Sequence, residues 1–107
     1  MANNYKNSKV DLTTTDATTL YTAPTATTAI IRSILVSEDS GNADTLTVTL
    51  TDSASAVFSL FKVKAVGANA TVEFLTQPLV VMESEILKVT AATANRLHVT
   101  ASYLEVS

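Results

Sequence analysis

The sequence contains no cysteine and no tryptophan, and it has only two glycines and two prolines among 107 residues. Without cysteine, the chain can form neither disulfides nor thiolate metal sites, and it has no thiol nucleophile. Gly41 and Gly67 lie too far apart for a glycine-rich phosphate loop. Charged residues make up only 16% of the chain, below the roughly 25% of an average soluble domain. Such a surface loses little on desolvation, which favours contact with a partner.

The sequence also lacks the segments that membrane and nucleic-acid partners require. No apolar run approaches the roughly 20 residues that span a bilayer, and the opening MANNYKNSKVD has no apolar signal-peptide core. The formal net charge is −3, and Lys62 and Lys64 are the one close basic pair. We therefore expect synthesis in the cytoplasm, with neither a membrane nor a nucleic acid as a partner.

Residues 45–51 read TLTVTLT, so that Leu46, Val48 and Leu50 share one face of an extended chain and four threonines share the other. This alternation is typical of a strand with one face on a core. Thr and Val recur in further segments, and β-branched residues favour a sheet. The sequence predicts strands over residues 10–14, 19–22, 28–37, 45–51, 56–65, 71–76, 79–82, 86–91 and 96–106.

Turn-forming residues separate these segments about every 8–12 residues, the spacing typical of an antiparallel sandwich or barrel. No window shows sustained helical periodicity. Turns are expected at residues 25–26, 39–42, 52–55, 67–69, 77–78, 83–84 and 93–95. The chain is therefore predicted to be all-β. We expect a single-domain antiparallel β-sandwich (jelly-roll or Ig-like) over residues 8–107, after a flexible N-terminal arm of residues 1–7.

The apolar positions also predict the core. Segment 28–37 is apolar on both faces, as in a central strand. Segment 96–106 alternates inward as far as Tyr103, but Leu104 and Val106 fall on the other face, which predicts a bulge or an edge near Tyr103. The predicted core consists of Ile31, Leu35, Leu46, Val48, Leu50, Phe58 or Phe61, Val72, Leu87, Val89, Leu97 and Val99.

The acidic segment SEDSGNAD, residues 37–44, raises the question of an ion site. Calcium prefers roughly six to eight oxygen ligands, and Asp39, Ser40, Asn42 and Asp44 could supply several. The spacing does not fit an EF-hand, because no Glu follows at the required distance and Gly41 comes too early. The same residue types favour a turn between strands. We interpret the segment as a turn and expect no metal site.

Other chemical groups give no catalytic constellation. His98 is the single imidazole, and no Gly-x-Ser-x-Gly nucleophile elbow accompanies it. Glu83 and Glu85 would project from one face of an extended segment, where paired carboxylates could flank a sugar. Their position at a predicted turn, together with the shortage of aromatic residues, favours solvated turn acids. We expect no catalytic residues and no cofactor.

Two features favour self-association instead. The face formed by Thr45, Thr47, Thr49 and Thr51 offers hydroxyls and methyl groups that suit a packed interface as well as water. Tyr5 is the one aromatic residue in the polar opening MANNYKN, and it could anchor the N-terminal arm in a groove of a neighbouring subunit. These five residues are the predicted interface of a homo-oligomer.

Several segments resemble a group of small structural proteins of tailed phages, cyanophage-like. In that group an LYT-x-P corner leads into an AI-x-x-SI strand, and an L-x-x-GD-x-L-x-V segment and a terminal V-x-x-S-Y-L-E strand follow. Here residues 20–24 read LYTAP, residues 28–36 read TAIIRSILV, residues 80–89 read VVMESEILKV and residues 99–105 read VTASYLE. In this sequence Glu83-Ser84-Glu85 stands where the pattern has its Gly-Asp turn.

The resemblance implies a β-sandwich virion protein that is made in the host cytoplasm and forms a homo-oligomer, with a trimer as the implied state. We expect foremost a capsid decoration (cement) protein, in contact with itself and with the major capsid protein or other virion proteins. The alternative is a neck, tail or fibre component that acts as an attachment or carbohydrate-binding module. An enzyme is not expected.

Overall fold

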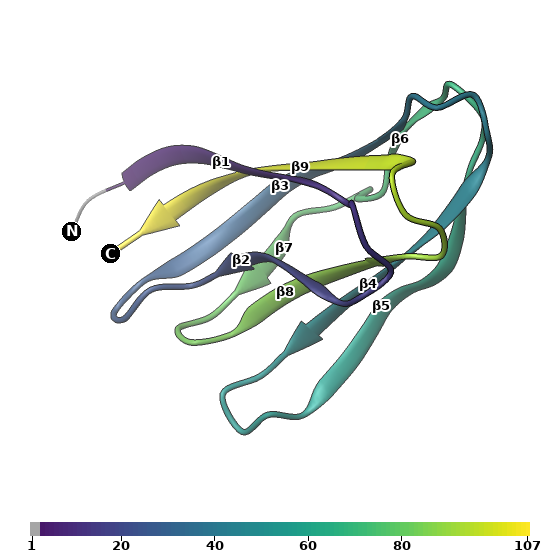
Figure 1. Cartoon of the computed structure of the whole chain (residues 1–107). Coiled ribbons are helices and arrows are strands. Elements are labelled where there is room, and N and C mark those ends of the chain that lie inside the picture. The colour runs from purple at the N-terminus through teal and green to yellow at the C-terminus, as the bar shows by residue number, and fades with distance from the viewer. Residues whose placement is uncertain (1–2) are drawn as a thin grey trace.

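A computed structural model describes residues 3–107, which form nine β-strands in two layers (Figure 1). The strands are β1 (Asn3–Asp11), β2 (Thr18–Thr22), β3 (Thr28–Glu38), β4 (Asp44–Thr51), β5 (Val57–Val66), β6 (Thr71–Glu73), β7 (Leu79–Val81), β8 (Ile86–Ala91) and β9 (Leu97–Val106). Sheet A has the order β1-β9-β3-β6, with β7 also paired to β3, and sheet B has the order β2-β8-β4-β5. All pairings are antiparallel, which confirms the predicted all-β sandwich. The described residues include no helix that could cross a membrane.

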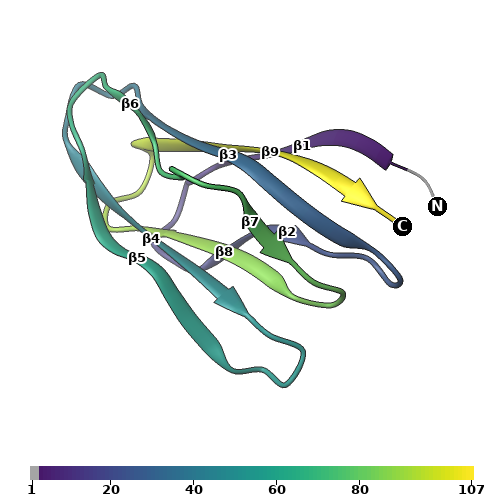
Figure 2. The ribbon, with the colours of Figure 1, turned by 180° about the vertical axis from the view of Figure 1, so that it is seen from behind.

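The strand pairs are nested within one another. β4 pairs with the next strand, β5; outside them β3 pairs with β6 and β7, then β2 with β8, and finally β1 with β9. β6 and β7 pair with two separate parts of β3 and act as one interrupted strand (Figure 2). Nine strands therefore count as eight, arranged as a long hairpin that folds over itself. Of the two sandwich topologies that the sequence left open, this is the jelly roll.

The core follows the period-two alternation along the strands. Seven predicted core residues are fully buried: Ile31, Leu46, Val48, Leu87, Val89, Leu97 and Val99. Three more are half-buried and pack against them: Leu50, Phe61 and Val72. In the open choice between two phenylalanines, Phe61 packs on the core, whereas Phe58 is 54% exposed.

The predicted irregularity near Tyr103 lies on the neighbouring strand. β9 alternates without interruption from Leu97 to Val106, and Tyr103 and Glu105 both face inward. The extra residue is Arg32 in β3, where the register shifts between Ile31 and Ser33. A bulge of this kind changes which residues of a strand face the core.

The prediction that Leu35 belongs to the core is wrong, because this side chain is 42% exposed. After the bulge, Ile34 and Val36 take the inward positions, and Leu35 points away from sheet B. β3 is central within its sheet, but the described residues provide no third layer to cover its outer face. Although residues 28–37 are apolar on both faces, only one face of this strand is therefore buried.

Residues 3–7, which were expected to form an arm, lie in β1 and pair with β9 from Asn3↔Val106 to Asn7↔Ser102. Residues 1–2 lie outside the described residues. The strand is mostly exposed, and its side chains give little sign of burial. Backbone hydrogen bonds to β9 hold this polar strand in place, and they cover a sheet edge that β9 would otherwise present.

The predicted turns all fall between strands, although the chain contains few glycines. Residues of other types take the left-handed backbone conformation that favours glycine. Ser84 does so with φ 67° at the position where the phage pattern has its Gly-Asp turn. The N–H of Glu85 donates to the carbonyl of Met82 over 3.0 Å, so this turn between β7 and β8 is tight without glycine.

Candidate functional site

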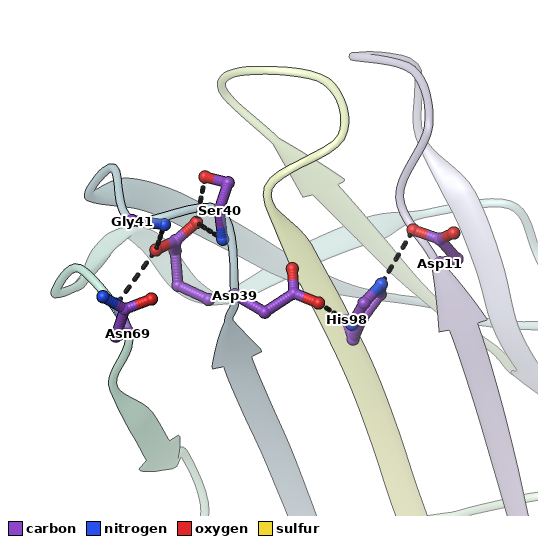
Figure 3. Close-up of polar contacts among 7 residues, drawn as sticks. Asp11, Asp39, Ser40, Gly41, Asn69 and His98 are labelled. Carbon is purple, nitrogen blue, oxygen red and sulfur yellow. Dashed lines mark hydrogen bonds and ion pairs between the residues drawn. The ribbon is translucent and has the colours of Figure 1, made fainter.

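The acidic segment forms the loop between β3 and β4, and Glu38 organises it. Figure 3 shows Ser40 and Gly41 of this loop facing Asn69. The Glu38 side chain is only 2% exposed. Its carboxylate accepts N–H groups from Ser40 at 2.7 Å, Gly41 at 3.1 Å, Asn42 at 3.1 Å and Asn69 at 3.0 Å. The Ser40 hydroxyl donates to the same carboxylate. Converging backbone N–H groups form an anion-binding nest, which here holds the chain's own carboxylate.

The nest also sets the charge of Glu38. Burial raises its pKa, but the hydrogen bonds from the Ser40 hydroxyl and from the N–H groups of Asn69, Ser40 and Gly41 together lower the pKa to about 2. Glu38 is therefore ionised at neutral pH. Because Asn69 belongs to the loop between β5 and β6, the carboxylate ties two loops at one end of the sandwich.

The three carboxylates of the acidic segment face different partners. Asp39 Oδ2 lies 3.5 Å from His98 Nδ1, and Asp44 Oδ2 accepts the N–H of Thr93 at 3.1 Å. Glu38 is occupied by the nest. Across residues 3–107, no three acidic or histidine side chains gather in a way that could hold a metal ion. The segment is a turn, as interpreted from the sequence, and its acids fix the loop backbone and neighbouring strands.

His98 lies between two carboxylates on the outer face of sheet A (Figure 3). Its Nε2 is 3.1 Å from Asp11 Oδ1, and its Nδ1 faces Asp39. Ser37 is the register partner of His98 on β3, so a serine, a histidine and an aspartate do share one row. Both ring nitrogens face carboxylates, and Ser37 is not among their hydrogen-bond partners. The arrangement links β1, β9 and the end of β3.

Glu83 and Glu85 do not form a pair. Glu83 Oε2 accepts the N–H of Ala26 at 3.0 Å, whereas Glu85 Oε1 accepts the N–H of Met82 at 2.8 Å. The left-handed Ser84 between them turns the two carboxylates toward different loops. They stabilise the turns at the end opposite Glu38, and their geometry offers no site for a sugar between two acids.

The predicted interface residues lie on two opposite faces. Thr45, Thr47, Thr49 and Thr51 are half-buried on the outer face of sheet B, beside outward residues of β8. Thr47 is partly occupied, because its hydroxyl accepts the N–H of Val63 in β5 at 3.1 Å. Tyr5 is 77% exposed on the outer face of sheet A. The structure therefore brings the four threonines together but does not bring Tyr5 to them.

A polar cluster at the chain termini was not predicted. Glu105 faces inward and is 7% exposed. Its Oε1 lies 2.8 Å from Lys6 Nζ, and its Oε2 accepts the Tyr21 hydroxyl at 2.6 Å. The Tyr21 ring contacts Tyr103 with centroids 4.3 Å apart, and the Tyr103 hydroxyl lies 2.8 Å from Ser8 Oγ. The signal was the uninterrupted alternation of β9, which places a Glu inside the sandwich and so requires partners for it.

The charges in this cluster support one another. Hydrogen bonds from Lys6 and Tyr21 lower the pKa of Glu105, and contact with Glu105 raises the pKa of Lys6. Burial, together with the hydrogen bond to Glu105, raises the pKa of Tyr21 well above its usual range. Glu105 is thus a charged acceptor that connects β1, β2 and β9.

No known family model and no curated protein matches this sequence. The class of the chain is therefore defined by its fold: a jelly-roll domain whose loops and strands are joined by polar contacts at both ends of the sandwich.

Proposed function

We propose that this chain is a structural virion protein of a tailed bacteriophage and works as a capsid decoration protein. One observation carries this proposal: segments that resemble the phage pattern meet at one end of the sandwich. Tyr21 of the LYT-x-P corner donates to Glu105 of the terminal strand and contacts the ring of Tyr103. The N–H of Ala23 donates to the carbonyl of Glu85 at 3.0 Å. The segments that resemble the phage pattern are thus in contact with one another in the structure.

The character of the broad faces supports the same proposal. The outer face of sheet B is lined by threonines, and the one charged residue among its register partners on β8 is Lys88. Faces of this kind lose little on desolvation against a capsid surface. Double-sheet jelly rolls occur in viral capsid domains, although a fold by itself does not determine function. We propose no enzymatic activity, because the ring nitrogens of His98 are both engaged by carboxylates.

The second candidate is a neck, tail or fibre component that binds carbohydrate. A surface hollow of about 360 Å³ between β5 and the segment before β7 favours it. Phe61, Leu60 and Leu75 line the hollow together with the polar Ser59 and Gln77. The Phe61 ring packs edge-on against Phe74, with centroids 5.3 Å apart, so it gives a sugar one partly covered ring. Jelly rolls also occur in lectins.

Counting the copies of this chain in purified particles tests the proposal. Quantitative mass spectrometry against the major capsid protein should find a copy number of the same order as the capsid subunits. A low copy number, as in a single ring of subunits, would favour the neck or tail, and absence from the particle would overturn the virion role. Binding of the isolated domain to host glycans, lost in Phe61→Ala but kept in the exposed Phe58→Ala, would favour the carbohydrate-binding candidate.

A further inference from the structure

The outer face of sheet A carries an apolar row that crosses four strands. In register, Tyr5 of β1 lies beside Leu104 of β9, Leu104 beside Ile30 of β3, and Ile30 beside Val80 of β7. Tyr5 is 77% exposed and Val80 is 51% exposed, while Leu104 and Ile30 between them are half-buried. Exposed apolar side chains that adjoin across strands mark a contact surface more than scattered ones do.

A second row on the same face has opposite charges at its two ends. It runs from Lys9 of β1 through Thr100 of β9 and Leu35 of β3 to Glu73 of β6. Lys9 and Glu73 are both exposed, and Leu35 is 42% exposed. The base and the acid are separated by the width of the sheet, so they do not pair within one chain.

We propose that this face packs against the same face of a second copy of the chain, about a two-fold axis. The axis lies in the interface, parallel to the strands and midway between β9 and β3. This operation exchanges β1 with β6 and β7, and β9 with β3, but keeps each row in place. Tyr5 then faces Val80 of the second copy, and Leu104 faces Ile30. The apolar row is covered at every position.

The charges on this face favour a second copy of the chain as its partner. The same axis places Lys9 of one copy over Glu73 of the other, twice in each pair. Packed sheets lie about 10 Å apart, a gap that a lysine and a glutamate side chain can span together. The exposed Arg32 at the β3 bulge would lie over β9 near Ser102 and Leu104, which carry no charge. A two-fold axis perpendicular to the strands and through the middle of the face, near Asn7 and Ser102, would instead place Tyr5 over Lys9 of the second copy.

The area of the face suits such a pair. β1, β9 and β3 have nine to eleven residues each, and β6 and β7 have three each. With strands about 4.8 Å apart and about 3.3 Å per residue, they cover roughly 600 Å² of flat sheet. A standard interface removes about 800 Å² of accessible surface from each partner, and side chains add to the flat area. The pairing is a property of the chain in solution and does not depend on the proposed virion role. Of the interface residues predicted from the sequence, it uses Tyr5 and leaves the four threonines exposed.

Sedimentation velocity over a concentration series tests the pairing. The parent should form dimers. Lys9→Glu places two acids against each other and should weaken the dimer by about tenfold or more. The matched control is Lys88→Glu on the outer face of sheet B, which changes the net charge equally and should leave the dimer unchanged. Tyr5→Asp, at a position that is 77% exposed and so tolerant in folding, should weaken it as well.

Charge reversal gives a further test. Glu73→Lys alone should not pair with itself, but a mixture of the Lys9→Glu and Glu73→Lys chains should form a heterodimer. Glu73 accepts the N–H groups of Ile34 at 2.8 Å and Leu75 at 3.1 Å, so the Glu73→Lys chain first needs a melting curve that shows it is folded. If it does not fold, Lys9→Glu, Lys88→Glu and Tyr5→Asp decide. A monomeric or trimeric parent would overturn the proposal, as would a dimer that Lys88→Glu weakens or that Lys9→Glu and Tyr5→Asp leave intact.

Discussion

Acidic side chains perform much of the turn building that glycine performs in other proteins. Glu38 holds the loop after β3, Glu73 accepts two N–H groups beside the β3 bulge, and Asp52 Oδ1 accepts the N–H groups of Ala54 and Ala56, both at 2.9 Å. A carboxylate that accepts several N–H groups stabilises an irregular backbone without requiring a flexible residue there. In these loops, carboxylates that accept backbone N–H groups therefore stabilise turns that contain few glycines.

We predict that Glu38→Gln lowers the stability of the protein at neutral pH and flattens its loss of stability in acid. The folded-state pKa of Glu38, about 2, lies below the ordinary value of 4.5. Its stabilisation is therefore fully present above about pH 4.5 and is lost as the pH falls toward 2. Thermal melting between pH 2 and 7 measures both effects.

Glu83→Gln is the matched control for this prediction. It removes the same charge from a loop at the other end of the sandwich, where the carboxylate accepts one N–H from Ala26. Its loss of stability at neutral pH should be smaller than that of Glu38→Gln, which removes the charge and one of the two acceptor oxygens from a nest of four N–H groups. Equal losses, or an acid profile of Glu38→Gln with the parent's slope, would contradict the role of the nest.

Among the strands, β5 shows how an exposed sheet edge is kept from pairing further. Its register against β4 shifts twice, between Leu46 and Val48 and between Val48 and Thr49. Bulges and lysines both discourage edge-to-edge association, and β5 carries Lys62 and Lys64. The bulged edge is thus protected.

We predict that Val63→Asn stabilises the protein by about 1 kcal/mol, because asparagine tolerates the left-handed conformation better than a β-branched residue. Val63 has φ 53° and is 59% exposed, so little apolar burial is lost. Val57→Asn is the control, since Val57 is 63% exposed in the same strand without a positive φ. Denaturant unfolding of both variants measures the difference. A Val63→Asn chain no more stable than Val57→Asn would show that the bulge is not strained.

The alternation of apolar residues predicted β2 to β9 and the turns between them. It failed where one inserted residue changed the facing of a strand. Arg32 does this in β3, so that Leu35 points outward although its segment is apolar. β1 was missed for another reason: a polar strand held by its backbone to β9 leaves no apolar signal. The Glu38 nest could not be predicted from the sequence, because one donor, Asn69, belongs to a distant loop.

At the scale of the whole molecule, the pairing of β1 with β9 makes residues 3–11 part of sheet A. We predict that a chain lacking residues 1–7 melts at a lower temperature than the parent and, although it loses Tyr5 from the proposed dimer face, forms large aggregates more readily through its freed β9 edge. The truncation removes the Lys6–Glu105 ion pair at 2.8 Å and leaves part of β9 as a free edge. Calorimetry and light scattering measure the two effects.

Two controls separate the causes of this loss. A chain lacking residues 1–2 should melt like the parent, and Lys6→Met should show the share of the ion pair alone. If the chain lacking residues 1–7 keeps the parent's melting temperature, residues 3–7 behave in solution as the flexible arm expected from the sequence, and their pairing contributes nothing to stability.

The nesting of the strands also dictates an order of events at the ribosome. Asn3 pairs with Val106, so β1 has no partner until the residues between it and the end of β9 have been translated. At about 5–20 residues per second, that wait lasts roughly 5–20 s. During it, β4 and β5 are the one adjacent pair of strands that can form a hairpin within a single sheet. A first strand of Asn, Lys and Ser, poor in apolar side chains, suits a nascent segment that has to stay unpaired without aggregating until its partner is made.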